Sequence, residues 1–268
     1  MPPTNSQPEA STDKRSADIA IVCSVRTEVA PLLHKLDRVR KYVDQGAVFR
    51  GGFLDETLRI AVVEAGAGFA KHREVTQTLL AEHHPVWVLS VGFSSPLTEE
   101  LKPGDVCVAN EIWDTHGNSL TVKCSIPESK RVLVRKHVVA DSHPRLRSER
   151  TALAESSGAI AVDTTSLAVA QACQSHEEDK PAAARFLSIR GMAGAFDQDL
   201  TQQAIEAAFE PVRQKKANLI GRLKSKVKPD PEQVAWQMAL DEAAVNLNRF
   251  VLGIIRQLGE KLGRSRWP

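Results

Sequence analysis

The sequence predicts a single-domain α/β protein, a three-layer α/β/α fold with a mixed, mostly parallel central sheet. Continuous apolar runs, such as residues 19–25 and 86–91, are typical of strands that helices cover on both faces. Between such runs lie segments with apolar residues at helical spacing, of which residues 70–82 are an example. Repeated alternation of these two kinds of segment favours a sheet flanked by helices.

The composition is that of an ordinary globular protein. Of the 268 residues, 42% are hydrophobic and 25% are charged, which suits one large α/β domain. The net charge of +2 comes from 35 basic and 33 acidic residues spread along the chain, so the bulk charge gives no reason to expect a nucleic-acid partner. The four cysteines form no Cys-x-x-Cys pair and indicate reduced, structural thiols.

Residues 1–17 are predicted to be a disordered tail, and residues 18–268 to be the folded domain. The tail is rich in Pro, Ser, Thr and charged residues and lacks the apolar core of a signal peptide. No later run has the length and apolarity needed to span a bilayer. The sequence therefore predicts a cytoplasmic protein with no membrane partner.

Each element of the domain is predicted from its local pattern. The first strand leads into a helix that begins at Glu28, and strands at 48–53 and 58–64 flank an acidic turn and form a hairpin. The other predicted elements are a helix at 70–82, a strand at 86–92 ending in a polar turn at 93–96, strands at 106–110, 131–139, 159–162 and 184–189, and a helix at 166–174.

The last quarter of the chain departs from this alternation. A basic run within residues 201–231 predicts an inserted helical arm with a solvated face. Residues 231–262 carry apolar side chains at helical intervals, so they are predicted to form a long amphipathic helix that packs on the sheet.

Four segments of the chain carry a family resemblance. They read IAIVCSVRTEVAPL, VEAGAGFAKH, PVWVLSVGFSSPLTEELKPGDVCVANE and GAIAVDTTSLAVAQAC. These segments resemble the nucleoside phosphorylase/5′-methylthioadenosine and S-adenosylhomocysteine nucleosidase superfamily, and the resemblance covers about residues 18–200 and the last helix. It implies a nucleoside phosphorylase-like fold that binds a purine ribonucleoside at the C-terminal edge of the sheet. It also implies no cofactor, and a homo-oligomer that is a dimer or larger.

The resemblance implies which residues form the site. Glu28 matches the glutamate that activates the attacking water, although a carboxylate here could instead stabilise the helix dipole from the helix N-terminus. The residues expected to bind the nucleoside are Gly66, Gly68, Gly92, Phe93, Ser94, Val138, Val139, Asp163, Thr164 and Thr165.

Two of these groups have a second interpretation. Gly66 and Gly68 let the backbone approach a ligand closely, but such a pair is also typical of a tight strand-to-helix turn. Asp163 can accept hydrogen bonds from ribose hydroxyls, whereas Asp163 or Thr164 would serve equally well as a cap for the helix that follows.

The group that protonates the departing purine is altered in this chain. The family's Arg-x-Ile-Ser-Asp signature is replaced by Arg190-Gly-Met-Ala-Gly194, so a glycine stands where the catalytic aspartate is expected. Asp197 matches the second aspartate of the family stretch and is the predicted replacement, with Asp199 as the alternative; both could equally be surface residues. Loss of a general acid typically costs about 10²–10⁴ in rate, so slow turnover is predicted.

Three functions are compatible with these residues. The first is hydrolysis of the N-glycosidic bond of an adenosine-type nucleoside, such as methylthioadenosine or S-adenosylhomocysteine. The second, which Gly194 suggests, is nucleoside binding with weak or no cleavage. The third is phosphorolysis, which needs an anion site for which Arg26 and Arg73 are the candidates. The spacing of His83, His84, His137 and His143 matches no familiar ligand set, so no metal is predicted.

Overall fold

The computed structural model describes residues 16–179, 184–201 and 231–266. Most of the predicted tail at 1–17 and of the predicted basic insertion at 201–231 therefore lies outside the described residues. Within the described ranges, no helix combines the length and apolarity that crossing a membrane requires.

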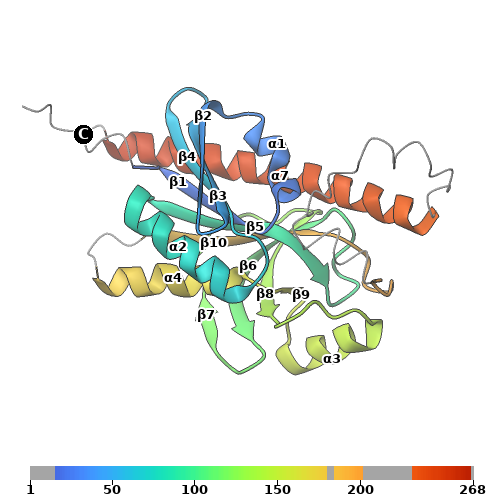
Figure 1. Cartoon of the computed structure of the whole chain (residues 1–268). Coiled ribbons are helices and arrows are strands. Elements are labelled where there is room, and N and C mark those ends of the chain that lie inside the picture. Colours follow the sequence, from blue (N-terminus) through green and yellow to red (C-terminus); the bar gives the residue numbers. More distant parts are fainter. Residues whose placement is uncertain (1–15, 180–183, 202–230, 267–268) are drawn as a thin grey trace, which may run out of the picture.

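In the part of the chain that the structure describes, a mixed sheet of ten strands forms the centre of the fold (Figure 1). The strands are β1 (Ile19–Cys23), β2 (Asp37–Asp44), β3 (Ala47–Leu54), β4 (Leu58–Glu64), β5 (Trp87–Pro96), β6 (Val106–Asp114), β7 (Ser119–Thr121), β8 (Val132–Val139), β9 (Ala161–Asp163) and β10 (Arg185–Met192). Their order is β10-β6-β8-β9-β5-β1-β4-β3-β2, with β7 paired to β6. β1 is fully buried and parallel to both β4 and β5, as its continuous apolar sequence predicts.

Five of the strands close into a ring. β5 is parallel to β10, β10 is antiparallel to β6, and β6 is parallel to β8. β9 continues parallel to β8 and then pairs antiparallel with the end of β5, at Ser95 and Pro96. Across the ring, the side chain of Asp163 at the end of β9 reaches that of Arg190, in the carboxyl-terminal half of β10.

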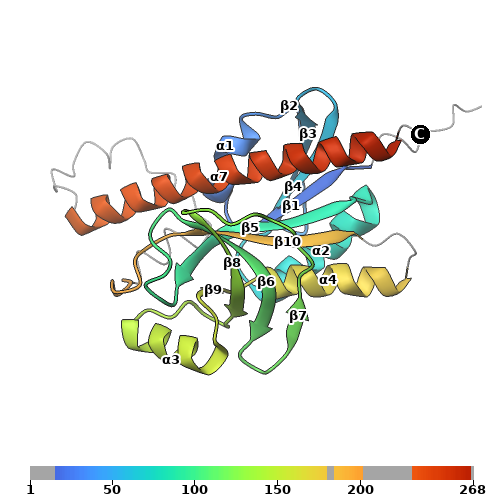
Figure 2. The same cartoon turned by 180° about the vertical axis from the view of Figure 1, so that it is seen from behind.

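Helices cover both faces of the sheet, which confirms the predicted three layers (Figures 1 and 2). α2 (Phe69–His83) and α4 (Ser166–Asp179) lie on one face and α7 (Pro231–Arg266) crosses the other, while α3 (Arg147–Ser157) lies beside β8 and β9. Successive residues of β1 point to opposite faces of the sheet. Ala20 and Val22 belong to the apolar cluster beneath α2 and α4, whereas Ile19 and Ile21 belong to the cluster that contains the apolar side chains of α7.

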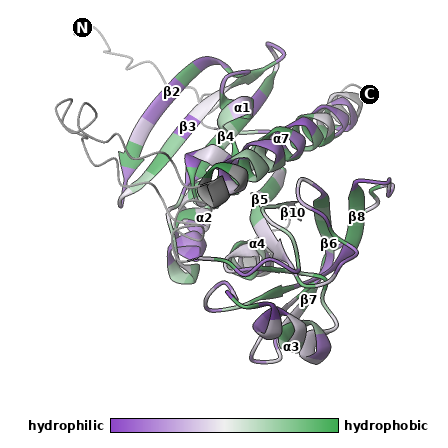
Figure 3. Ribbon diagram, turned by 90° about the vertical axis from the view of Figure 1, so that its right-hand side faces the viewer, coloured by the Kyte–Doolittle hydropathy of each residue, from purple (hydrophilic) through white to green (hydrophobic). Residues whose placement is uncertain are grey.

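The structure differs from the sequence prediction at several elements. β2, β7 and α3 were not predicted; β2 is exposed along almost its whole length and mixes hydrophilic and hydrophobic residues, so it has no alternating pattern to detect (Figure 3). The predicted polar turn at 93–96 is wrong, because these residues continue β5. The buried Ser94 hydroxyl donates to the Val162 carbonyl at 2.7 Å, which satisfies this polar group inside the sheet.

The predicted helix at Glu28 is shorter than expected and is tied to α7. A 3-10 turn, η2 (Arg26–Glu28), is followed by the single-turn helix α1 (Ala30–Leu33). The buried Asn248 side chain of α7 accepts from the Leu32 N–H at 3.1 Å and donates to the Glu28 carbonyl at 2.8 Å. One amide side chain thus fixes the segment that carries Glu28.

Candidate functional site

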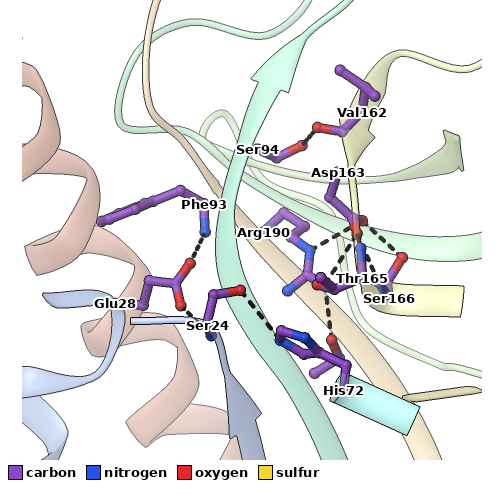
Figure 4. A network of polar contacts seen from close by, with 11 residues as sticks. Ser24, Glu28, His72, Phe93, Ser94, Val162, Asp163, Thr165, Ser166 and Arg190 are labelled. Atoms are coloured by element: carbon purple, nitrogen blue, oxygen red, sulfur yellow. Dashed lines mark hydrogen bonds and ion pairs between the residues drawn. The ribbon is translucent and has the colours of Figure 1, made fainter. Parts of the chain in front are cut away.

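Glu28 lies just beyond the carboxyl end of β1, and backbone amides hold its carboxylate. The N–H groups of Ser24 and Val25 donate to Oε2 at 2.7 and 2.9 Å, and the Phe93 N–H donates to Oε1 at 3.0 Å (Figure 4). The side chain is buried, with 2% of the residue exposed. The bonds to Ser24 and Val25 are those of a glutamate closing a helix start, and the bond to Phe93 joins this start to β5.

Burial raises the pKa of Glu28 to about 7. The amide hydrogen bonds of Val25 and Phe93, together with the positive charge of Arg190, oppose this rise. A carboxylate whose pKa lies near neutrality is suited to accept a proton from water, because it is substantially ionised and still basic at neutral pH.

Gly92 provides the space in which Glu28 and Arg190 approach each other. A Cβ at this position would lie 2.8 Å from Glu28 Oε1 and 3.1 Å from Arg190 Nη1. Any larger residue would therefore displace one of these charged groups. Phe93 thus bonds the Glu28 carboxylate and Gly92 borders it, while contact of either residue with a nucleoside remains a prediction.

Arg190 forms a buried ion pair with Asp163 (Figure 4). Its Nε lies 3.1 Å from Asp163 Oδ2, its Nη2 donates to Ser90 Oγ at 2.8 Å, and each of the two charged residues is only 2% exposed. Burial alone would raise the pKa of Asp163, but the Arg190 charge and hydrogen bonds hold that pKa well below its ordinary value. Asp163 is therefore ionised at neutral pH.

Asp163 also begins α4. Its Oδ1 accepts from the Thr165 and Ser166 N–H groups, both at 2.7 Å, and its Oδ2 accepts from the Ser166 hydroxyl at 2.7 Å. The capping role that the sequence suggested for Asp163 is thus present in the structure. With its oxygens bonded to these groups and to Arg190, the carboxylate has little remaining capacity for ribose, and that role stays a prediction.

The space beside Gly194, where the resemblance predicts the family's catalytic aspartate, is filled by Trp236 of α7. A Cβ on Gly194 would lie 2.6 Å from Trp236 Cζ3 and 3.0 Å from Trp236 Cη2, well inside van der Waals contact. The Trp236 ring is buried beside Ala193 and Leu200 in the main apolar cluster. An aspartate at residue 194 and the present position of Trp236 are mutually exclusive.

The two candidate replacement acids lie on the surface. Asp197 and Asp199 are exposed, and Asp199 Oδ1 accepts from the Arg147 N–H at the start of α3. The same segment is tied to α3 by Arg150, whose guanidinium donates to the carbonyls of Phe196 and Gln198. In the described residues no hydrogen bond or ion pair joins either aspartate to Glu28 or Arg190, so their catalytic role remains a prediction.

A cavity of about 620 Å³ opens at the carboxyl ends of β1, β4, β6, β8 and β9, which is where open α/β sheets bind ligands. Its lining consists of Ser24, Ala67, Gly68, Phe69, Asp114, Thr115, His116, Asn118, Val139, Ala140, Asp141, Ser142, His143, Thr164 and Gln171. A cavity of similar size, about 610 Å³, lies near the amino-terminal ends of β5 and β10, beside Trp87 and Arg185. Its position makes it the weaker candidate.

The structure brings three predicted binding residues, Gly68, Val139 and Thr164, to the wall of the first cavity. Val138 is buried against Leu97 and Val162, on the other side of its strand. Ser24 and its hydrogen-bonded partner His72, which lies on α2, were not predicted as site residues. A serine one residue past a strand and a histidine four residues past a glycine turn had no separate motif to mark them.

The remaining polar candidates do not assemble into a second centre. Arg26 and Arg73 are exposed. His83 lies beside the Tyr42 hydroxyl at 3.0 Å, while His137 is completely buried on β8. No group of three or more His, Cys, Asp or Glu side chains in the described ranges could hold a metal ion.

The raised pKa of Glu28 predicts how stability changes with pH. A carboxyl whose pKa is higher in the folded than in the unfolded state stabilises the fold fully below its ordinary pKa of 4.5, and this contribution is lost as pH rises through about 7. The loss amounts to about 3 kcal/mol. Urea unfolding measures the free energy of unfolding, which should be lower at pH 8 than at pH 5 in the wild type. In Glu28→Gln the difference between the two pH values should be much smaller. Glu99 is exposed, so Glu99→Gln should show the same change in stability with pH as the wild type. The same change in all three proteins would contradict the conclusion that burial raises the pKa of Glu28.

The sequence of residues 18–149 matches the profile of the phosphorylase superfamily. Comparison with curated protein sequences gives no match.

Solved structures share the fold of this chain at low sequence identity. One is a 5′-methylthioadenosine/S-adenosylhomocysteine nucleosidase from Colwellia psychrerythraea 34H in complex with adenine, with a TM-score of 0.66, 17% identity, and coverage of 91% of this chain and 96% of that chain. Another is a futalosine hydrolase mutant of Helicobacter pylori strain 26695, with a TM-score of 0.65 and 16% identity. The match covers 90% of this chain and 99% of that chain. A third is the 5′-methylthioadenosine/S-adenosylhomocysteine nucleosidase of Neisseria meningitidis in complex with methylthio-immucillin-A. Its TM-score is 0.65 and its identity 17%, and the match covers 89% of this chain and 98% of that chain.

Proposed function

From membership of the phosphorylase superfamily, which the family match and the fold support, we propose that this chain is a purine nucleosidase. It hydrolyses the N-glycosidic bond of an adenosine-type nucleoside, of which methylthioadenosine and S-adenosylhomocysteine are the first substrates to test. The nucleoside occupies the cavity at the carboxyl ends of the strands, and the protein works as a homo-oligomer, a dimer or larger, in the cytoplasm.

The observation that carries this proposal is the state of Glu28. Its carboxylate is fixed by three backbone amides at the edge of the sheet, and its pKa is raised to about 7. Cleavage of an N-glycosidic bond develops positive charge on the sugar, and a water held by a carboxylate can attack there as it loses a proton. The positive charge of Arg190, which borders Gly92 as Glu28 does, favours the ionised form of Glu28.

Within the described residues, neither the position of Gly194 nor its two candidate replacements supplies a fixed acid for the departing base, and we therefore expect slow turnover. Trp236 fills the space beside Gly194, and both Asp197 and Asp199 are exposed. Without protonation the base leaves as an anion, which typically lowers the rate by about 10²–10⁴ relative to an enzyme with the acid in place.

Adenine release from methylthioadenosine tests the proposal. We expect the wild type to release adenine above the uncatalysed background, with kcat/KM rising with pH and levelling off above about 7 as Glu28 ionises. Glu28→Gln should lower the rate by about 10²–10⁴ and remove this pH dependence. Glu99→Gln is the matched control and should act like the wild type. If the wild type releases no adenine above background at high protein concentration, it is not a hydrolase of this substrate.

A second candidate function, nucleoside binding with little or no cleavage, is favoured by the packing of Trp236 against Gly194. It is distinguished by a nucleoside-dependent rise in melting temperature without product, since a ligand that binds only the folded state stabilises it. A flat thermal shift across a panel of nucleosides would exclude both candidates for those ligands. Phosphate-dependent formation of ribose 1-phosphate would instead identify a phosphorylase.

A further inference from the structure

Ser24 and His72 form a hydrogen-bonded pair at the wall of the cavity (Figure 4). Ser24 Oγ lies 3.2 Å from His72 Nε2, and His72 Nδ1 lies 3.0 Å from the Gly68 carbonyl oxygen. Ser24 lines the cavity, whereas His72 is buried behind it with 1% of the residue exposed. The pair joins the end of β1 to the first turn of α2.

The hydrogen atoms of this chain of contacts have only one consistent arrangement when His72 is neutral. The Gly68 carbonyl can only accept, so His72 carries its proton on Nδ1 and donates it there. Burial lowers the pKa of His72 to about 4, so the ring is neutral at neutral pH and Nε2 has no proton. Nε2 must then accept, and the Ser24 hydroxyl donates to it.

This arrangement fixes the chemistry that Ser24 offers to a ligand. A serine hydroxyl has one proton and two lone pairs, and here the proton is directed to His72. Toward the cavity Ser24 therefore presents an acceptor. A ligand hydroxyl or N–H group can donate to it, while a ligand carbonyl or carboxylate cannot receive a hydrogen bond from it.

We infer that Ser24, oriented by His72, is a specificity-determining residue that accepts a hydrogen bond from a sugar hydroxyl of the nucleoside. This inference rests on the proposed function. A ribose supplies hydroxyl donors, and the carboxylate of Asp163, the residue expected to accept from them, is already bonded to Arg190 and to the start of α4. Ser24 is an acceptor in the cavity wall whose orientation is set by a neighbouring side chain.

The first test concerns the orientation of the pair and needs no ligand. Nitrogen-15 NMR of the imidazole at neutral pH should show His72 as the neutral Nδ1–H tautomer. The Nε2–H tautomer, or a protonated ring, would reverse the direction of the Ser24 hydrogen bond and overturn the inference.

The second test compares adenosine with its 2′-, 3′- and 5′-deoxy analogues by calorimetric titration. The wild type should bind adenosine about three- to tenfold more tightly than one of these analogues, the range of a single neutral hydrogen bond. Ser24→Ala should weaken adenosine binding by that factor and leave the same analogue unchanged. Ser156→Ala is the matched control, because this serine is exposed on α3 and does not line the cavity; it should retain the discrimination.

Two variants of His72 separate orientation from packing. His72→Gln places an amide oxygen that can accept from Ser24 and should retain part of the discrimination, whereas His72→Leu should lose it. Equal weakening of all four ligands by Ser24→Ala would overturn the assignment of Ser24 while leaving nucleoside binding intact. Absence of binding of every nucleoside to the wild type would overturn the proposed function, and the ligand assignment with it.

Discussion

Arg190→Met is expected to lower the free energy of unfolding by about 3–5 kcal/mol, the cost of removing one partner from a buried ion pair. Asp163 would keep its hydrogen bonds to the start of α4 but would lose its counter-charge while remaining 2% exposed. Ser90 would also lose its donor. Equilibrium unfolding in guanidinium chloride at neutral pH measures the change.

Arg185→Met is the matched control for this experiment. Arg185 lies on the same strand, is exposed, and stacks over the Trp87 ring at 5.4 Å, so its removal should cost no more than about 1 kcal/mol. The double variant Asp163→Asn/Arg190→Met removes both charges and should be more stable than Arg190→Met alone. An Arg190→Met protein within about 1 kcal/mol of the wild type would show that the pair does not anchor the ring of strands.

The ion pair also predicts a response to acid. The pKa of Asp163 is lower in the folded state than in the unfolded state, so its stabilising contribution is complete above the ordinary carboxyl pKa and declines as pH falls below it. Arg190→Met should lose most of this dependence. The direction is opposite to that of Glu28, whose contribution is lost as pH rises, so the two carboxylates can be separated by their pH windows.

The sequence was sufficient to predict elements whose apolar pattern is decided by burial. β1, α2 and α7 have continuous or helically spaced apolar residues because they face the core, and the structure has them within a few residues of the predicted bounds. The extension of β5 through Ser94 and Ser95 was missed, because local sequence cannot reveal that buried hydroxyls are satisfied by β9.

The sequence marked single positions of the candidate site but not their connections. Glu28 and Asp163 were predicted from their resemblance to family segments and their roles remain predictions, whereas the pairing of Asp163 with Arg190 joins residues 27 apart in the chain through the closure of the strand ring. Contact between Trp236 and Gly194 also depends on how α7 crosses the sheet. The sequence predicts from Gly194 that the family's acid is absent, and only the packing shows that Trp236 occupies the space beside this glycine.

Gly194→Asp is expected to destabilise the protein rather than to restore the acid. The new Cβ would lie 2.6 Å from the Trp236 ring, and overpacking of this kind costs about 1–3 kcal/mol before the added carboxylate is considered. Gly194→Ala isolates the steric part of this cost. Gly253→Asp is the matched control, since a Cβ there meets nothing within 4 Å and the change should alter stability by about 0.5 kcal/mol or less.

The double variant Gly194→Asp/Trp236→Ala should reveal what Trp236 excludes. Trp236→Ala alone is expected to cost about 3–5 kcal/mol of stability, because a buried aromatic ring is lost. In its absence an aspartate at residue 194 has room, and the double variant should release adenine about 10²–10⁴ times faster than Trp236→Ala, the contribution of a general acid. Equal rates in these two variants, with both folded by circular dichroism, would show that an aspartate at residue 194 does not act as the acid. Equal stability of Gly194→Asp and wild type would show that the ring is free to move out of that position.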